Sequence, residues 1–400
     1  MPRPSPRALR VTDVADIRSS VILAPNWLGD AVMALPAIDD WHRHRPGTRL
    51  IVAARRAVAR VFALVPWIDD VVELEWNGRA SDWRAMMRDV TRLRALGADA
   101  ALLLPNSFAS AWLAFAARVP ERWGYASDGR SVLLTRAIGL PPRRVQGDPA
   151  YADDVGPRRE SVGQVLLDPP RQNVGRGLVA PPLHQGRYYQ HLVHALGAAN
   201  GPLEPRLVVP DSAVADARTL LMSAGWDGNR PLVAFAPGAA YGTAKRWWPT
   251  HFARLAADLI GTDGAHIVLI GSAADGATTA EVRGLVPEHV RASVSDLAGR
   301  TSLDVLAAIL ALARACVSND SGAMHVAAAV GVPLTALFGP TNEHETAPLA
   351  HAPMDLLIHD VSCRPCMLRE CPIDHPCMRD LDPARVLASV SRMLSRGKAS

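Results

Sequence analysis

Short apolar runs alternate with longer amphipathic segments in both halves of the chain. In the first half the runs lie at 21–24, 49–53, 71–74 and 100–104, and helix-length segments lie at 31–43, 56–65 and 82–96. In the second half the runs lie at 232–236, 266–270, 315–318 and 334–338, and helical segments at 252–260, 302–313 and 322–330. Strands separated by helix-length segments are typical of parallel βαβ units. The two series predict an α/β protein with two doubly wound, Rossmann-like domains.

The segment between the two series, residues 141–182, has a different composition. It is dense in Pro, Gly, Arg and Asp, and we interpret it as a loop or insertion in the first domain. The pattern predicts the following organisation: an N-terminal tail at 1–19, a first domain at 20–185, a linker at 186–201, a second domain at 202–382, and a C-terminal helix and tail at 383–400.

Length and composition indicate a soluble globular protein of more than one domain. With 400 residues the chain is too long for one ordinary core, and 49% hydrophobic with 20% charged residues is typical of a folded protein. No apolar run reaches the roughly 18 residues of a membrane span, and residues 1–20 contain arginines without the apolar stretch of a secretory signal. We therefore expect a cytoplasmic protein.

The basic residues are almost all arginines, since only Lys245 and Lys398 among 43 Lys and Arg residues are lysines. The net charge of +4 is small for this length, and no dense basic tract with interleaved aromatic residues occurs. Nucleic-acid binding is therefore not expected. A basic face toward an acidic substrate or an anionic membrane surface remains open.

The first strand-to-helix turn, Pro25-Asn26-Trp27-Leu28-Gly29-Asp30, lacks the features of a dinucleotide site. Such a turn usually contains three glycines, which let the backbone approach a pyrophosphate. Here a single glycine, Gly29, precedes Asp30, whose negative charge is poorly suited to holding a phosphate. A dinucleotide-dependent oxidoreductase is therefore disfavoured.

The turn after the 232–236 strand is better suited to an anion. Its sequence, PGAAYGTAKRWWP, contains Gly238 and Lys245 and leads into a helix that begins at Pro249, where proline fits the first turn. A solvated Lys-Arg pair in an ordinary loop is one interpretation. Because the chain uses arginine almost everywhere else, a lysine at the end of a parallel strand favours a phosphate site, with Lys245 as a compact positive charge.

A second anion site is suggested where the 315–318 strand leads into Asn319-Asp320-Ser321-Gly322 and an Ala- and Val-rich helix. Asp320 or Ser321 is expected to cap this helix. The same helix N-terminus also presents amide donors to an anion, and His325 follows in the first turn. Alone, His325 would be an ordinary helix histidine, but the combination at the end of a parallel strand favours a ligand site.

Several sequence strings, in this order along the chain, resemble glycosyltransferase family 9 and within it the lipopolysaccharide heptosyltransferase II group. They are NWLGDAVMALP at 26–36, LLLPNSFASA at 102–111, PGAAYGTAKRW at 237–247, LIGSAADG at 269–276, LAGRTSL at 297–303 and VSNDSGAMHVAAA at 317–329. The resemblance covers most of residues 20–390. The segment 141–182 and the N-terminal tail depart from the family pattern.

The resemblance implies a GT-B fold, in which two Rossmann-like domains face each other with the active site in the cleft between them. It also implies inverting transfer of heptose from ADP-L-glycero-D-manno-heptose to heptosyl-Kdo-lipid A in the lipopolysaccharide inner core. Such a displacement needs a base for the acceptor hydroxyl, and Asp30 is in the place to supply it. Lys245 and the amides around Ser321 and Gly322 would stabilise the leaving ADP. Another nucleotide sugar or acceptor, or a non-catalytic sugar-nucleotide binding protein, remains an alternative.

The resemblance also implies the remaining site residues. Donor contacts are expected from Gly238, Lys245, Gly271, Ser272, Leu297, Gly299, Thr301, Asp320, Ser321, Gly322 and His325, and acceptor contacts from Trp27, Gly29, Asn106 and Ser107. No metal-binding DxD motif is evident, so catalysis is expected to be metal-independent and to need no cofactor. The expected partners are ADP-heptose, a lipid A-core glycolipid and the surface of the inner membrane, and we expect a monomer.

Arginines in the first domain are candidates for the mouth of the acceptor site, because an anionic glycolipid is attracted by positive charge. They are Arg118, Arg122, Arg130 and the pair Arg143 and Arg144. The alternative is that they express a coding bias on a solvated surface.

Four of the five cysteines lie close together in the sequence, as Cys363-x2-Cys366-x4-Cys371-x5-Cys377 with His375 nearby. A small structural zinc or iron–sulfur site is one interpretation. The other is reduced thiols in a loop before a final helix at 383–394, and the spacing does not match a common zinc ribbon. The fifth cysteine, Cys316, is expected in the core.

Overall fold

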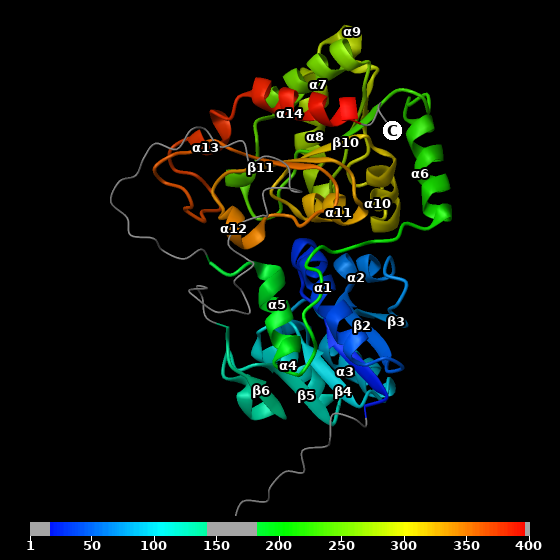
Figure 1. Ribbon diagram of the computed structural model, residues 1–400, viewed down its shortest axis with the longest axis vertical. Helices are drawn as coiled ribbons and strands as arrows, with labels where there is room; N and C mark the ends of the chain where they lie inside the picture. Colours follow the sequence, from blue (N-terminus) through cyan, green and yellow to red (C-terminus); the bar gives the residue numbers. More distant parts are fainter. Residues whose placement is uncertain (1–16, 142–181, 397–400) are drawn as a thin grey trace, which may run out of the picture.

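The structure is a computed structural model that describes residues 17–141 and 182–396. These residues form two α/β domains, one above the other in Figure 1. The pair Arg143 and Arg144, and residues 142–181 of the expected insertion, lie outside the described residues.

The first domain contains a six-stranded parallel sheet in the order β3-β2-β1-β4-β5-β6. Its strands are β1 (Ser19–Leu23), β2 (Arg49–Arg55), β3 (Asp70–Leu74), β4 (Ala100–Leu103), β5 (Glu121–Tyr125) and β6 (Arg136–Ile138). The central strand β1 lies between β2 and β4, with Val21 opposite Ile51 and Ala101. Four of the five residues of β1 are buried, as expected for a strand covered on both faces.

Helices cover the two faces of this sheet (Figure 1). They are α1 (Leu28–His44), α2 (Arg56–Phe62), α3 (Trp83–Ala95), α4 (Phe108–Ala116) and α5 (Gln185–His194), with short 3-10 turns η2 (Ala80–Asp82) and η3 (Arg130–Leu133). Since α5 ends at His194, residues 186–194 of the segment expected to be a linker, 186–201, are helical. Helix α5 packs closely against α1, because its Tyr189, Leu192 and Val193 are buried in the same apolar core.

The second domain has a parallel sheet in the order β12-β11-β10-β7-β8-β9. Its strands are β7 (Leu232–Ala236), β8 (His266–Leu269), β9 (Val294–Asp296), β10 (Ala315–Asn319), β11 (Leu334–Phe338) and β12 (Met354–Ile358). The helices are α6 (Asp211–Ser223), α7 (Pro249–Asp263), α8 (Gly276–Leu285), α9 (Glu288–Arg291), α10 (Leu303–Leu312), α11 (Gly322–Val330), α12 (Glu343–Thr346), α13 (Pro376–Arg379) and α14 (Pro383–Arg396). Numbered within its own domain, this sheet has the same strand order as the first.

This strand order determines where a ligand site can form. In doubly wound sheets, ligands bind beyond the carboxyl ends of the strands, where the order reverses. The reversal lies between β1 and β4 in the first domain and between β7 and β10 in the second. Asn106, Lys245 and Asp320 lie in the loops that follow β4, β7 and β10, and Asp30 lies in the first turn of the helix that follows β1. The fold therefore places four expected site residues at the two reversal points.

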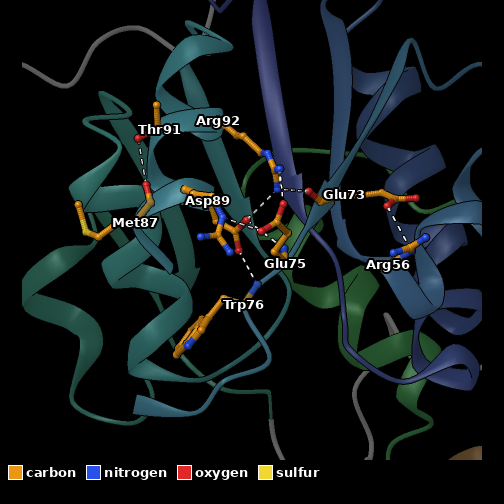
Figure 2. A network of polar contacts seen from close by, with 9 residues as sticks. Arg56, Glu73, Glu75, Trp76, Met87, Asp89, Thr91 and Arg92 are labelled. Carbon is orange, nitrogen blue, oxygen red and sulfur yellow. Dashed lines mark hydrogen bonds and ion pairs between the residues drawn. The ribbon is translucent and has the colours of Figure 1, made fainter. Parts of the chain in front are cut away.

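The edge of the first sheet shows how a helix is fixed to a strand by polar contacts (Figure 2). Asp89 of α3 is completely buried, and its two carboxylate oxygens accept hydrogen bonds from the amides of Glu75 and Trp76 at 3.0 and 2.8 Å. Arg92 lies one turn further along α3 and pairs with Glu75. The buried carboxylate thus satisfies the backbone amides that the end of β3 leaves without a strand partner.

The two domains are joined by a continuous apolar core. One cluster of buried side chains extends from α1 and α2 into α10 and α11, which face each other in Figure 1. An ion pair between Arg60 and Asp304, at 3.3 Å, lies across the same interface. No helix among the described residues is long and apolar enough to cross a membrane.

Candidate active site

Asp30 lies in the first turn of α1, directly beyond β1 and partly buried at the domain interface. The hydroxyl of Tyr189 on α5 donates a hydrogen bond to its Oδ1 at 3.2 Å. Burial raises the pKa of Asp30, while the Tyr189 hydrogen bond and the positive charge of Lys245 act in the opposite direction. A carboxyl with a raised pKa that accepts a hydrogen bond from a neutral tyrosine hydroxyl has the properties of a general base.

Two glycines allow the N-termini of α1 and α11 to approach each other from opposite domains. A Cβ on Gly29 would lie 2.8 Å from Cδ2 of His325, and a Cβ on Gly322 would lie 2.8 Å from Cβ of Leu28. These distances are shorter than non-bonded carbon contacts allow. The glycine before Asp30 is therefore explained by contact across the interface rather than by approach to a pyrophosphate.

Lys245 is held at the end of η5 (Thr243–Lys245), in the loop after β7. Its Nζ lies 2.6 Å from Oδ2 of Asp320, and the same oxygen accepts a hydrogen bond from the hydroxyl of Thr341 at 2.6 Å. The side chains of Lys245 and Asp320 are only 13% and 5% exposed, so the alternative of a solvated loop lysine is wrong. The Nζ also lies 4.9 Å from the centroid of the Tyr241 ring, within the range of a cation–π contact.

The N-terminus of α11 has no side-chain cap among the described residues. Asp320 points to Lys245 and Thr341, and Oγ of Ser321 lies 3.2 Å from Oγ of Ser318. The expectation that Asp320 or Ser321 caps the helix is therefore wrong, because both side chains have other partners. The first amides of α11 remain donors for an anion, and the helix dipole favours negative charge there.

His325 is buried in the first turn of α11 and contacts Gly29 across the interface. Burial lowers the pKa of His325 to about 4, although the nearby Asp320 acts in the opposite direction. The imidazole is therefore neutral at pH 7. It can offer one donor and one acceptor, but no positive charge, to a ligand in this place.

Two glycines expected to contact the donor, Gly238 and Gly271, lie around the carboxylate of Asp275. This carboxylate accepts hydrogen bonds from the amide and hydroxyl of Ser272 at 2.9 and 2.7 Å. A Cβ on Gly238 would lie 2.1 Å from Oδ1 of Asp275, and a Cβ on Gly271 would lie 2.9 Å from its Cβ. The loops after β7 and β8 are thus in contact where the sequence places the donor.

The third loop of this group follows β9. Gly299 has a φ of +71°, which favours glycine, and its amide donates to the carbonyl of Gly271 at 2.9 Å. Leu297 is completely buried, so its side chain packs in the core and only its backbone faces the loops. Thr301 lies two residues beyond Gly299, before α10.

In the first domain, the loop after β4 is held by hydrogen bonds to α5, to the residues after β5 and to the start of α4. Asn106 donates to the hydroxyl of Tyr188 at 2.7 Å, and Oγ of Ser107 caps α4 by accepting from the amide of Ser110 at 3.3 Å. The amide of Phe108 donates to a carboxylate oxygen of Asp128 at 2.6 Å. Trp27, at the N-cap of α1, is 58% exposed and free to contact a ligand.

Two of the arginines expected at the acceptor mouth have structural roles instead. Arg130 is completely buried and donates to the carbonyl of Tyr125 at 2.9 Å and to Oγ of Ser110 at 3.0 Å. Burial lowers its pKa to about 10. Arg122 donates to the carbonyls of Leu133 and Val119. Arg118 is exposed and remains a candidate.

Comparison with known proteins identifies the family of this chain. The model of glycosyltransferase family 9 (heptosyltransferase) matches residues 180–376. The lipooligosaccharide heptosyltransferase 2 of Haemophilus influenzae is 32% identical over 335 residues, which are 82% of this chain and 86% of that protein. The lipopolysaccharide heptosyltransferase 2 of Salmonella typhimurium is 31% identical over 337 residues, which are 83% of this chain and 85% of that protein. The chain belongs to glycosyltransferase family 9.

The solved structure of Escherichia coli ADP-heptose lipopolysaccharide heptosyltransferase II aligns with a TM-score of 0.73 and 25% sequence identity, covering 95% of this chain and 99% of that chain. The family and the GT-B fold expected from the sequence strings are therefore confirmed. This family 9 chain is a glycosyltransferase.

Three residues at the site of this family 9 enzyme were not predicted from the sequence. Tyr189 contacts Asp30, Thr341 contacts Asp320, and Tyr188 contacts Asn106. The chain has only five tyrosines, and two of them are adjacent at 188–189. The adjacent tyrosines were the feature of the sequence that could have indicated a site, but they lie in the segment expected to be a linker.

The four clustered cysteines are free thiols in the described part of the chain. Burial raises the pKa of Cys377 to about 11, and the other three lie near enough to influence it. Among the described residues, however, no group of three or more His, Cys, Asp and Glu side chains is arranged to hold a metal ion. The structure thus gives the zinc or iron–sulfur interpretation no support, and Cys316 lies in the core as expected.

Proposed function

We propose that this family 9 glycosyltransferase moves heptose from ADP-L-glycero-D-manno-heptose to heptosyl-Kdo-lipid A, with inversion at the anomeric carbon and without a metal ion. The observation that carries the proposal is the position of Asp30. It follows the central strand of the first domain and lies within electrostatic range of Lys245 of the second. A base and a cation on opposite domains match a displacement in which acceptor and leaving group lie on opposite faces of the sugar.

In the proposed reaction, the ionised carboxylate of Asp30 takes the proton of the acceptor hydroxyl as its oxygen attacks the anomeric carbon. The bond from that carbon to the diphosphate oxygen breaks, and the electron pair leaves with ADP. Trp27, Gly29, Asn106 and Ser107 are proposed to contact the acceptor, since they lie at or beside the loops that follow β1 and β4.

The leaving ADP gains negative charge, which Lys245 and the uncapped amides of α11 are proposed to stabilise. Positive charge and oriented amides supply here what a divalent cation supplies in other transferases. The proposed donor contacts also include His325 and the backbone of the loops after β7, β8 and β9. Asp320 acts mainly by fixing Lys245, because its Oδ2 is shared by Lys245 and Thr341.

A donor screen with the purified protein tests the proposed activity. ADP-heptose, UDP-glucose and GDP-mannose are offered with heptosyl-Kdo-lipid A, and release of the nucleoside diphosphate is followed. We expect release of ADP that depends on the acceptor. Turnover of another donor would replace the proposed substrate, and binding without turnover with every acceptor tested would favour a sugar-nucleotide binding protein.

The proposal includes peripheral contact of a monomer with the inner membrane at its cytoplasmic face, because the acceptor carries lipid A. Support comes from exposed aromatic residues of the first domain that lie beside arginines. Trp83 is 57% exposed with Arg84 over its ring. Phe115 is 49% exposed, and Arg122, whose guanidinium is held by the carbonyls of Leu133 and Val119, lies over its ring. The same assay, run with the acceptor in anionic and in neutral vesicles, tests this contact, and equal rates would argue against it.

Replacing Tyr189 by Phe should alter the pH dependence of transfer. The substitution removes the hydrogen bond that lowers the pKa of Asp30, so this pKa should rise further. Because the base works only when ionised, the acidic limb of the kcat/KM profile should move to higher pH, while the rate at high pH changes little. Lys245, the charged residue that acts on Asp30, and His325, which lies beside Gly29, are unchanged. An unshifted profile would remove Tyr189 from this role.

A further inference from the structure

The Cys-rich segment, defined here as residues 359–377, has no part in the reaction described above, yet its backbone contacts the loop that carries Lys245. The amide of Ala244 donates to the carbonyl of Arg369 at 3.0 Å, and the hydroxyl of Tyr241 donates to the carbonyl of Met367 at 2.9 Å. The guanidinium carbon of Arg369 lies 5.1 Å from the centroid of the Tyr241 ring. Tyr241 thus contacts both Arg369 and Lys245.

The same segment also holds the loop that carries Thr341. The amide of Met367 donates to the carbonyl of Pro340 at 2.9 Å, so the two peptide groups of this residue connect both loops. Arg364, whose side chain is 7% exposed, donates to the carbonyls of Gly339 and Thr341 and pairs with Glu343 at 2.9 Å. The Cys-rich segment therefore connects the loop of Lys245 with the loop of Thr341, and both of these side chains contact Asp320.

The backbone at the centre of this bridge adopts an uncommon conformation. Met367 has a φ of +56°, in the left-handed region that few residues other than glycine occupy. Such a conformation persists where surrounding contacts determine it. Its side chain is 46% exposed, so the two hydrogen bonds of its backbone, rather than packing of the side chain, account for its position.

The contact between the two segments leaves no space for a side chain at Gly242. A Cβ there would lie 2.2 Å from the carbonyl oxygen of Arg369 and 2.8 Å from its carbonyl carbon. The backbone of Gly242 is extended, so an alanine has no conformational cost of its own and acts only through this clash. Gly242 and Tyr241 are the points at which the bridge can be disturbed without altering Lys245.

We propose that the Cys-rich segment is a brace that positions Lys245 against the diphosphate of the donor, with Tyr241 and Gly242 as positioning residues. The inference rests on the proposed role of Lys245 in binding ADP. It gives the segment a function that needs no metal ion, because backbone contacts hold it against the loops of Lys245 and Thr341. Sγ of Cys377 lies 3.4 Å from the position that a Cβ on Gly339 would take.

The test measures binding of ADP and of adenosine to the full chain by calorimetry, with the variants Gly242→Ala and Tyr241→Phe. We expect ADP to bind about tenfold more weakly in Gly242→Ala, which equals about 1.4 kcal/mol. Tyr241→Phe loses one hydrogen bond and keeps the ring, so a loss of roughly 2- to 10-fold is expected. Adenosine, which has no phosphate, should bind equally to all forms. Gly261→Ala is the matched control, since a Cβ at Gly261 meets nothing within 4 Å.

A double-mutant cycle shows whether the brace acts through Lys245. In a Lys245→Ala background, Gly242→Ala should weaken ADP binding no further, because the lysine ammonium that Gly242→Ala displaces is already absent. Hydrogen exchange provides a readout that does not depend on the donor, and amides at 241–245 and 363–371 should exchange faster in Gly242→Ala.

Three results would overturn the brace: unchanged ADP affinity in both variants, an equal loss for adenosine, or additivity with Lys245→Ala. Failure of the proposed donor has a different signature, because the wild-type chain would then bind UDP or GDP in preference to ADP. The cycle is in that case carried out with the nucleotide that binds. The brace and the identity of the donor are thus tested separately.

Discussion

Replacing Asp30 by Asn should lower the rate of transfer by roughly 10²- to 10⁴-fold, the usual effect of losing a general base. The amide has nearly the same shape, and its oxygen can still accept the hydrogen bond from Tyr189. The donor site lies on the other domain, so ADP affinity should remain close to that of the wild type. The measurement is the single-turnover rate with ADP-heptose and acceptor, together with ADP binding by calorimetry.

The stability of this variant separates loss of a base from loss of the fold. Burial raises the pKa of Asp30, so the stability that this carboxyl contributes is present at low pH and is lost as the pH rises through its folded pKa. At neutral pH the neutral Asn removes that cost, and Tm should not fall. Asp39→Asn on the same helix is the control, because Asp39 lies at the surface and pairs with Arg43. Near-normal turnover in Asp30→Asn would exclude this residue as the base.

The centre of each sheet could be predicted from the sequence, because central parallel strands are buried on both faces and appear as continuous apolar runs. Strands β7 and β11 and helix α11 have the predicted bounds. The loops that follow the central strands could also be identified, since their polar residues interrupt those runs. Asp30, Lys245 and Asp320 were found in this way, and the sequence strings then indicated the family.

Three of the four edge strands, β6, β9 and β12, were not predicted, whereas the edge strand β3 coincides with the expected run at 71–74. β6 and β9 have three residues each, and β5 carries Glu121 and Arg122. Short or charged segments form strands here because a neighbouring strand offers hydrogen bonds, which is a tertiary effect and not a local pattern. β12 is fully buried, yet it was not predicted from the sequence. Its Asp355 accepts hydrogen bonds from Ser389 and Arg392 of α14.

The partners of the site residues depend on contacts between distant parts of the chain. Tyr189 is 159 residues from Asp30 in the sequence, and it reaches that carboxylate only because α5 returns to pack on α1. Gly29 and Gly322 likewise have no local reason to be glycine. The need arises when the two domains meet and Gly29 contacts His325. No spacing within one segment contains this information.

The Cys-rich segment is a different case, in which a local pattern suggested a metal site. Cysteine spacing indicates which thiols are near one another, but it does not show what the backbone between them contacts. In the structure the peptide groups of Met367 and Arg369 provide the contacts with the Lys245 loop. Backbone groups have no signature in the sequence, so this arrangement could be seen only in the fold.

Replacing Lys245 by Ala should weaken ADP binding and slow transfer together. A hydrogen bond to a charged group contributes about 1.5–3 kcal/mol, which corresponds to roughly 10- to 150-fold in ADP affinity. Loss of a group that stabilises developing negative charge reduces kcat by roughly 10²- to 10³-fold. Calorimetry with ADP and single-turnover kinetics measure the two effects separately.

The variant also leaves Asp320 buried with Thr341 as its remaining side-chain partner, and an unpaired buried carboxylate is destabilising. The double variant Lys245→Ala with Asp320→Asn removes that charge. It should regain thermal stability without regaining ADP affinity, which separates a damaged fold from a missing cation.

Arginine at position 245 should restore only part of the function. The wild-type ammonium lies within 2.6 Å of Asp320 and 4.9 Å from the centre of the Tyr241 ring, in a site where 13% of the lysine side chain is exposed. A planar guanidinium keeps the charge but has a different shape and cannot occupy the place of a compact ammonium. Affinity for ADP should therefore recover further than the rate of transfer, because the charge alone attracts a diphosphate while stabilisation of the leaving oxygen depends on position. If Lys245→Ala binds ADP as tightly as the wild type, this lysine does not contact the diphosphate, and the anion site must be assigned to the amides of α11 alone.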